Sequence, residues 1–235
     1  MKQRDLVSAL LAEAVGTFFF FFVGMGAVMA NQYSGGGSGL IGVAFAHGIA
    51  LALMVSAFGY ISGGHFNPAV SVGLAVARKI TPVNAVLYIV AQCVGAVIAA
   101  YALMFIFPKA VFDATHGAIP ALGPDISVAT GIAVEAILTG ILLFMVLMTA
   151  VDERAPKIAG FAIGLAIFID ILMGGPLTGA AMNPARWFGP AIATMDFTNW
   201  YVWIVGPVLG GVVATLLYLG IFKRPEENKT ALPGV

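Results

Sequence analysis

The chain has 235 residues, of which 60% are hydrophobic and only 9% are charged, with a formal net charge of zero. A soluble domain carries about 25% charged residues, so this composition is typical of a protein with several membrane-spanning segments. The balanced charge gives no indication of nucleic-acid binding. The single cysteine, Cys93, excludes an internal disulfide, and no metal-ligand cluster is present, so we expect no metal site and no cofactor.

Six long apolar runs follow one another along the chain. About 20 apolar residues cross a bilayer, and by this measure the sequence predicts six membrane-spanning helices. They cover approximately residues 6–30, 38–60, 83–106, 128–150, 158–174 and 201–222.

Most basic residues lie in segments that a six-helix topology places on one side of the membrane. These segments are the N-terminus, the loops 78–82 and 151–157, and the C-terminal tail. The positive-inside rule therefore predicts a multi-pass protein of the cell membrane with both termini in the cytoplasm. We expect residues 226–235 to form a polar tail.

The second and fifth apolar runs each lead into a short segment that begins with the same three residues. The two copies are separated by 116 positions and consist of Asn67, Pro68 and Ala69, and of Asn183, Pro184 and Ala185. Asparagine is a good helix N-cap and proline is favoured at the first helical position. The apolar segments 67–77 and 183–193 are too short to cross a bilayer, so they predict two re-entrant half-helices.

Other markers repeat in the same order in both halves of the chain. Residues 13–17 resemble 135–139, and residues 88–95 resemble 203–210. Three spans are an odd number, so the second half must enter the membrane upside down relative to the first. The sequence therefore predicts an all-α membrane protein with six transmembrane helices and two re-entrant half-helices in an inverted repeat.

We expect a single domain. It covers residues 1–225, with repeats at about 5–107 and 127–222 that are joined by a loop at 108–126.

Inverted symmetry brings the two asparagines together near the middle of the bilayer. The N-terminal end of a helix carries roughly +0.5 of an elementary charge, and two such ends face the same point. The side-chain amides of Asn67 and Asn183 can donate hydrogen bonds to a small neutral solute, whereas cations and protons are repelled. This pattern predicts a pore, although both asparagines also fit the simpler reading of helix caps.

Two other classes of membrane protein were weighed against a channel. A secondary transporter shares inverted repeats and broken helices, but it needs an ion site or titrating carboxylates, and only Glu13, Glu135 and Asp170 are available. An intramembrane enzyme needs a nucleophile with a base, or a metal motif, and neither is present. We therefore expect a passive channel and no enzymatic activity.

The chain resembles aquaporins, members of the major intrinsic protein family, over nearly its whole length. The resemblance rests on the two Asn-Pro-Ala segments, the run 63–65, Arg186, and the carboxylates Glu13 and Glu135. It implies a homotetramer in the lipid bilayer with one pore in each subunit. It also implies that both carboxylates hold the re-entrant loops through hydrogen bonds to backbone amides.

The resemblance further implies a selectivity filter on the outer side of the Asn-Pro-Ala centre. Its members here are His47, Ile171, Ala180 and Arg186. This set differs from that of common water-only members and is similar to the plant tonoplast-intrinsic group. Ammonia-permeable members of that group also carry a loop histidine, here His116, which contacts the filter arginine; the alternative is that His116 is a solvated loop residue.

The function that follows is a passive channel for water and ammonia that excludes protons and other ions. Ile171 and Ala180 would form an apolar wall, while Arg186 and His47 would supply hydrogen-bond donors. The alternative is a facilitator for glycerol or other small neutral solutes, because the apolar wall leaves room for them.

Several further residues are candidates with less defined roles. Gly64, His65 and Gly179 are candidates for the pore lining, and His65 could equally brace its loop. Asp170 lies within an apolar run, where a charge is costly, so it is either protonated or bound to a neighbouring loop or subunit. Trp187 stands where water channels often carry serine or threonine and glycerol channels aspartate, which argues mildly against a glycerol pathway.

Overall fold

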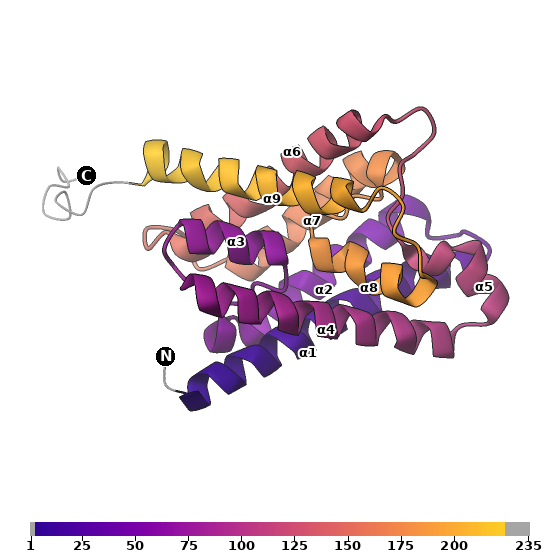
Figure 1. The fold of residues 1–235 in the computed structure, drawn as a ribbon, viewed down its shortest axis with the longest axis horizontal. Helices are drawn as coiled ribbons and strands as arrows, with labels where there is room; N and C mark the ends of the chain where they lie inside the picture. The colour runs from indigo at the N-terminus through magenta and orange to yellow at the C-terminus, as the bar shows by residue number, and fades with distance from the viewer. Residues whose placement is uncertain (1–2, 224–235) are drawn as a thin grey trace, which may run out of the picture.

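The computed structural model describes residues 3–223 as a bundle of long helices (Figure 1). Six helices are long and apolar enough to cross a membrane. They are α1 (Gln3–Tyr33), α2 (Gly39–Ser62), α4 (Pro82–Ile106), α6 (Val128–Val146), α7 (Ala159–Thr178) and α9 (Trp200–Leu217). Single π-helical turns at Leu147–Val151 and Tyr218–Phe222 extend α6 and α9.

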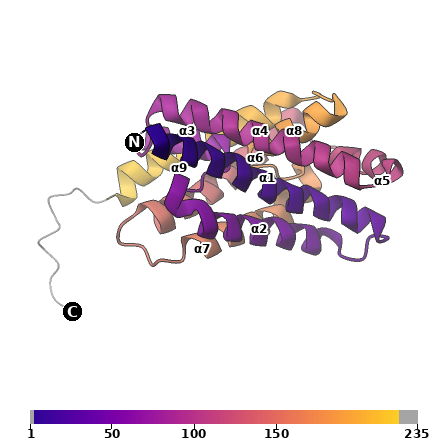
Figure 2. The ribbon, with the colours of Figure 1, turned by 90° about the horizontal axis from the view of Figure 1, so that it is seen from below.

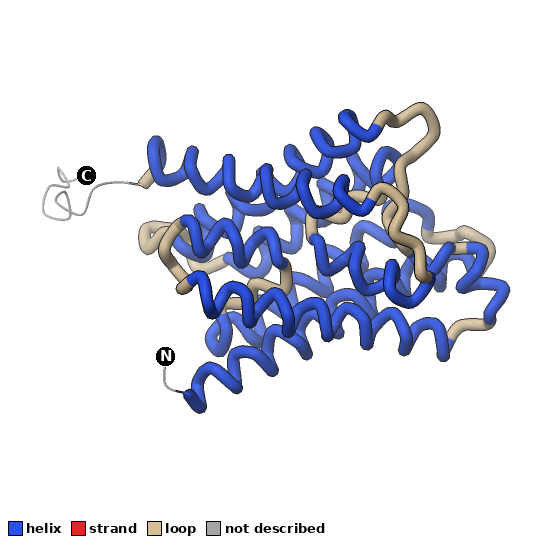
Figure 3. The backbone as a smooth tube through the Cα atoms, viewed as in Figure 1, coloured by secondary structure: helices blue, strands red, loops and turns tan. Residues whose placement is uncertain are grey.

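Two short helices lie among the long ones, where the half-helices were predicted. They are α3 (Pro68–Val76) and α8 (Pro184–Thr194). The secondary structure within residues 3–223 is helix and loop, without strands (Figure 3). The predicted fold class is therefore confirmed, while the expected polar tail at 226–235 lies outside the described residues.

The end of the fifth spanning helix was predicted wrongly. We expected it to stop at residue 174, before Pro176, but α7 continues to Thr178 and is capped by Gly179 with a φ of 77°. A proline removes only its own backbone donor, and a buried helix can continue through it when the surrounding packing is favourable. The left-handed conformation that ends such a helix is most easily adopted by glycine.

The loop that joins the halves contains structure that was not predicted. It holds the short helix α5 (Lys109–Ala114) and the 3₁₀ turn η1 (His116–Ala118). Both are too short to give a periodic pattern in the sequence. They lie at the end of the bundle opposite to the start of α1 and the end of α9 (Figure 1).

Each half of the chain forms a three-helix unit, and each half-helix reaches into the other unit. In the first half, α1 packs against α2 and α4; in the second half, α6 packs against α7 and α9. The half-helix α3 packs on α9, and α8 packs on α4 (Figures 1 and 2). This exchange of half-helices ties the two repeats into one body.

The two repeats meet most closely where α2 crosses α7. A Cβ atom added to Gly48 would lie 2.7 Å from the carbonyl oxygen of Gly164, and one added to Gly164 would lie 2.4 Å from that of Gly48. Small residues let membrane helices approach until their backbones touch. The reciprocal contact shows that these glycines are equivalent residues of the two repeats.

Large apolar side chains cover the outside of the bundle. Exposed examples occur on each of the long helices and include Leu11, Leu53, Phe105, Ile137, Ile169 and Leu216. Such a surface is stable against lipid tails, so it agrees with a protein embedded in a bilayer.

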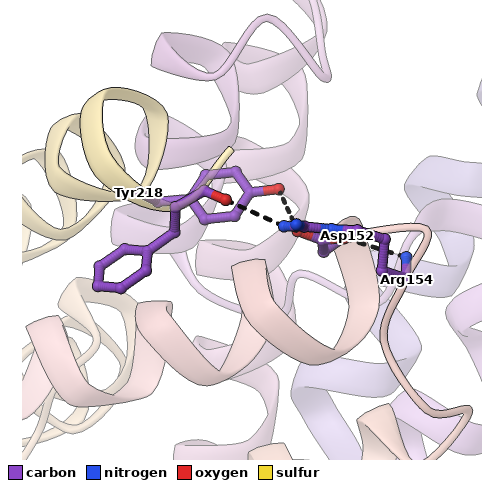
Figure 4. A network of polar contacts seen from close by, with 4 residues as sticks. Asp152, Arg154 and Tyr218 are labelled. Atoms are coloured by element: carbon purple, nitrogen blue, oxygen red, sulfur yellow. Dashed lines mark hydrogen bonds and ion pairs between the residues drawn. The ribbon is translucent and has the colours of Figure 1, made fainter. Parts of the chain in front are cut away.

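A polar network links the loop after α6 to the end of α9 (Figure 4). The guanidinium of Arg154 donates to both carboxylate oxygens of Asp152, at 2.8 and 2.5 Å, and to the carbonyl oxygen of Phe222 at 3.0 Å. The hydroxyl of Tyr218 donates to Asp152 at 3.3 Å. The hydrogen bond from Arg154 holds the pKa of Asp152 well below its usual range, so this carboxylate is ionised at neutral pH.

Candidate functional site

The two Asn-Pro-Ala segments begin the half-helices in the same way. Asn67 has an extended backbone, and its side-chain oxygen accepts from the Ala69 N–H at 2.8 Å. Asn183 does the same with the Ala185 N–H at 3.0 Å. Both asparagines are therefore helix caps, and proline occupies the first helical position of each half-helix, as the sequence predicts.

The amide nitrogens of the same two side chains join the repeats. Asn67 Nδ2 donates to the Met182 carbonyl oxygen, and Asn183 Nδ2 donates to the Phe66 carbonyl oxygen, both at 2.9 Å. An amide NH₂ group has two N–H donors, so one donor of each asparagine is left for a third partner. Both asparagines line a narrow cavity.

This cavity extends from the asparagines toward one end of the bundle. Its volume is about 10 Å³, which is close to the least space that holds one water molecule. Its walls come from both repeats and are mainly apolar: Phe20, Leu51, Gly64, His65, Phe66, Val70, Leu142, Val146, Ile163 and Ile167. The walls offer little for a hydrated ion to bind.

Two of the three candidate lining residues, Gly64 and His65, belong to this cavity. The His65 ring also contacts Ser71 Oγ at 3.0 Å and packs edge-on against Tyr88, with ring centroids 5.0 Å apart. It therefore lines the cavity and braces its loop at once. Gly179 is not part of this wall; a Cβ there would lie 2.9 Å from Pro120.

Two buried carboxylates hold the loops that lead into the half-helices. Glu13 accepts hydrogen bonds from Ser62 Oγ, from the backbone N–H groups of His65 and Phe66, and from Gln92, at 2.6 to 3.0 Å. In the second repeat, Glu135 accepts from Thr178 Oγ1 and from the N–H groups of Ala181 and Met182, at 2.7 to 2.9 Å. These are contacts of the kind that the resemblance implied.

The loops that the carboxylates hold contain left-handed backbone. Gly64 and Phe66 have φ values of 65° and 47°, and the equivalent residues Ala180 and Met182 have values of 43° and 52°. A non-glycine residue in this region is strained, and the strain persists only where the surroundings fix it. The buried carboxylates supply such a constraint.

The four residues assigned to the filter are all buried, and none of them is among the residues that line the cavity. Ile171 lies on α7, Ala180 in the loop after it, Arg186 in the first turn of α8 and His47 on α2.

The expected donor role of His47 differs from what its contacts allow. Its Nδ1 lies 2.9 Å from the Val43 carbonyl oxygen, which only accepts, so Nδ1 carries a proton and uses it within α2. The opposite edge of the ring fits against Gly24, where a Cβ would lie 2.4 Å from His47 Cδ2. The His47 ring is therefore held between its own helix and α1.

His116 does not make the contact with Arg186 that the resemblance implied. Its Nε2 lies 2.8 Å from a carboxylate oxygen of Asp196, and its side chain is 61% exposed. The loop instead reaches Arg186 through its backbone, because Arg186 Nη1 donates to the Ala118 carbonyl oxygen at 2.8 Å. No sequence motif indicates Ala118 or Asp196, since one contact uses a backbone atom and the other joins distant loops.

The two residues without a defined role lie apart from these contacts. Trp187 packs parallel to Trp203, with ring centroids 6.3 Å apart, and against Phe197, so it belongs to a satellite core. Asp170 is buried on α7, and its Oδ2 has no hydrogen-bond partner within the described part of the chain. The predicted contact of Asp170 with a neighbouring loop is absent from residues 3–223.

A bundle in which two half-helices meet at paired asparagines defines a membrane channel. The sequence matches the family model described as "Major intrinsic protein" over residues 1–218. The chain belongs to this family, the aquaporins, and the resemblance stated from the sequence is confirmed.

Plant aquaporins are among its similar relatives. Aquaporin TIP4-4 of Zea mays is 43% identical over 229 residues, which cover 94% of this chain and 89% of that protein. Probable aquaporin TIP2-2 of Arabidopsis thaliana is 38% identical over 224 residues, covering 92% and 88%. The X-ray structure of the aquaglyceroporin from Plasmodium falciparum superposes with a TM-score of 0.81 at 30% identity, covering 92% of this chain and 96% of that one.

Proposed function

We propose that this chain is a passive channel that conducts water and ammonia and excludes protons and other ions. The observation that supports this best is the pair of buried asparagines at opposed half-helix ends, each with one N–H committed to the opposite repeat and one left over. Two positive helix ends at one point repel cations, while a lone pair on water or ammonia can accept from the free N–H groups.

The filter residues support ammonia as a second solute. Ile171 and Ala180 place apolar surface opposite the single charged donor, Arg186. Ammonia is close to water in size but loses its hydrogen bonds at a lower free-energy cost. An apolar wall therefore disfavours the passage of ammonia less than a polar wall does. The fixed charge of Arg186 acts against ammonium and other cations.

A glycerol facilitator is the second candidate. The likeness to a solved aquaglyceroporin and the small Ala180 side chain favour it. The cavity of about 10 Å³ below the filter argues against it, because a three-carbon solute needs more room.

The family resemblance also supports a homotetramer with one pore per subunit. The similarity to TIP aquaporins favours an internal membrane over the cell membrane that the sequence alone suggested. In either membrane, the basic loops favour cytoplasmic termini.

The test is a pair of measurements on proteoliposomes that contain the purified protein. Stopped-flow light scattering under an osmotic gradient reports water, and an internal pH dye reports ammonia after an ammonium pulse. We expect faster shrinkage and faster alkalinisation than in empty liposomes, with no added proton leak. Fast shrinkage together with alkalinisation at the rate of empty liposomes would show that the protein conducts water but not ammonia. Fast shrinkage under a glycerol gradient, followed by rapid reswelling, would favour a glycerol facilitator. Saturation or ion dependence of the flux would favour a transporter.

A further inference from the structure

The turn of residues 116–118 carries backbone strain that the channel function described so far does not use. His116, Gly117 and Ala118 have φ values of 48°, 61° and 59°, so three consecutive residues are left-handed and two of them are not glycine. Strain of this kind costs of order 1–3 kcal/mol per residue and persists only where neighbouring contacts impose it.

Three contacts impose the conformation, and all of them come from α8 or from the loop that follows it. Asp196 binds His116 Nε2 at 2.8 Å, and a Cβ on Gly117 would lie 2.6 Å from Thr194 Cγ2. At the other end of the turn, the Ala118 carbonyl oxygen accepts from Arg186 Nη1 at 2.8 Å. The turn is therefore clamped between the outer end of α8 and the filter arginine at its inner end.

We propose that Asp196 is a positioning residue of the selectivity filter, which holds the 116–118 turn through His116 and thereby keeps Arg186 drawn against the Ala118 carbonyl. The proposal rests on the filter described under the proposed function. Arg186 is surrounded by buried residues, and in the proposed filter it faces the pore. If its guanidinium were released from the Ala118 carbonyl, it would therefore move into the pore. Loss of the clamp should therefore narrow the pore on average and slow ammonia more than water.

The electrostatics around the turn agree with a built contact. Helices α1, α5 and α8 pack against the turn. Residues 20–33 of α1 contain no charged residue, while α5 contributes Lys109 and Asp113, which pair with each other at 2.5 Å. Helix α8 contributes Arg186, which is bound to the Ala118 carbonyl oxygen. Asp196 is the charged group that contacts His116, and its own position is fixed by the Thr198 N–H at 2.8 Å.

One member of the clamp carries a fixed negative charge. Hydrogen bonds from Thr198 and then His116 lower the pKa of Asp196 to about 2, so it stays ionised at every pH of a transport assay. A hydrogen bond to an ionised acceptor is stronger than one between neutral groups, so Asp196 is well suited to hold the turn.

The test compares Asp196→Ala, His116→Ala and the double variant in proteoliposomes, with ammonia and water permeability measured on the same vesicles. We expect each single variant to lower the ratio of ammonia to water permeability by about threefold, the order of one lost hydrogen bond, with water permeability nearly unchanged. The double variant should lower the ratio no further, because the two residues act through one contact. Retained water flux shows that the variants fold.

The matched control is Asp113→Ala. This change removes a carboxylate from a pocket of about 450 Å³ that His116 and Gly117 also line, and that carboxylate pairs with Lys109 rather than with the 116–118 turn. It should leave the ratio at the wild-type value. Asp196→Asn keeps an acceptor for His116 but removes the charge, so it should lower the ratio less than Asp196→Ala does.

Additive effects of the two alanine variants, equal loss of water and ammonia, or an Asp113→Ala variant that behaves like Asp196→Ala would each overturn the proposal. If Arg186→Ala alters selectivity while the Asp196 variants do not, only the clamp is wrong. If Arg186→Ala has no effect, the proposed filter itself fails.

Discussion

The centre of the proposed pore and the proposed outer filter are built from different relations between the two repeats. At the centre each residue has an equivalent 116 positions away, and the contacts are reciprocal, as for Asn67 and Asn183. The filter has no such symmetry. The residues of the other repeat that lie 116 positions from the filter residues are apolar or small: Ile163 for His47, Gly64 for Ala180 and Val70 for Arg186. All three line the inner cavity.

This difference separates two tasks. The symmetric centre supplies two opposed helix ends and fixes the pore axis, and a duplicated sequence is enough to build it. Discrimination between solutes needs a polar group on one wall and apolar groups on the other, which a symmetric site cannot provide. We infer that solute selectivity lies in the residues by which the repeats differ.

The largest expected effect is the loss of a loop-holding carboxylate. Glu135→Leu would leave two buried backbone N–H groups and the Thr178 hydroxyl without their acceptor, at about 1–3 kcal/mol each. Glu13→Leu should be at least as damaging, since Glu13 also accepts from Gln92. We expect both variants to aggregate or to melt well below the wild type in detergent, as measured by a thermal unfolding scan.

Glu135→Gln is the control for this prediction, because it keeps an acceptor of nearly the same shape and should be milder. Melting of either leucine variant within a few degrees of the wild type would contradict the assignment of the carboxylates as the supports of the centre.

A large but selective effect is expected for the filter arginine. Arg186→Ala should raise glycerol or urea permeability relative to water by roughly tenfold, the factor that corresponds to about 1.4 kcal/mol. Val70→Ala, at the equivalent inner position, should change this ratio little. Light scattering with each solute as the osmolyte measures both variants, and a similar change in the two would remove the distinction between centre and filter.

A smaller effect is expected at the strained filter residue. Ala180 has a φ of 43°, so Ala180→Gly should relieve about 1 kcal/mol of strain and raise the melting temperature by a few degrees, while it widens the filter by one methyl group. The reciprocal change Gly64→Ala should lower the melting temperature, since its Cβ would lie 3.3 Å from Gly59 Cα. A lower melting temperature for Ala180→Gly would show that the packing of the Ala180 methyl group stabilises the fold by more than the backbone strain destabilises it.

The smallest effect is expected outside the membrane. Arg154→Ala removes the link from the loop after α6 to Phe222, but the side chain is exposed, so the melting temperature should fall by at most about 2 °C. Because the pKa of Asp152 is depressed, the ion pair between Asp152 and Arg154 persists while the carboxylate is ionised. It is lost only as the pH falls through that low pKa. The difference in melting temperature between the variant and the wild type should therefore be constant from pH 5 to pH 8. A marked change in the water permeability of Arg154→Ala would instead indicate that this network has a role in gating.

The fold could be predicted from the sequence because its signals are long and repeated. Each spanning helix has an apolar run of sufficient length, and each half-helix has an asparagine cap followed by proline. The predicted end of α7 is wrong because Pro176 does not stop the helix, which is capped by Gly179.

The site was predictable only in part. Asn67 and Asn183 belong to a recognisable pattern, and the structure shows that each caps a half-helix. Arg186 follows the second copy of this pattern and lies in the first turn of α8. The partners of Arg186 and His116 could not be predicted, since a backbone carbonyl carries no sequence signal and Asp196 lies 80 residues from His116. Such contacts depend on how two loops meet in space, which the pattern within either loop does not determine.

The central claim, that selectivity resides in the asymmetric filter, is tested most directly by moving one histidine. The ratio of ammonia to water permeability should be measured in proteoliposomes for Ile171→His, in the filter, and for Ile163→His, on the same helix but in the inner cavity. We predict that Ile171→His lowers the ratio severalfold, while Ile163→His lowers both fluxes together and leaves the ratio unchanged. Equal changes of the ratio in the two variants, or a change only for Ile163→His, would contradict the account.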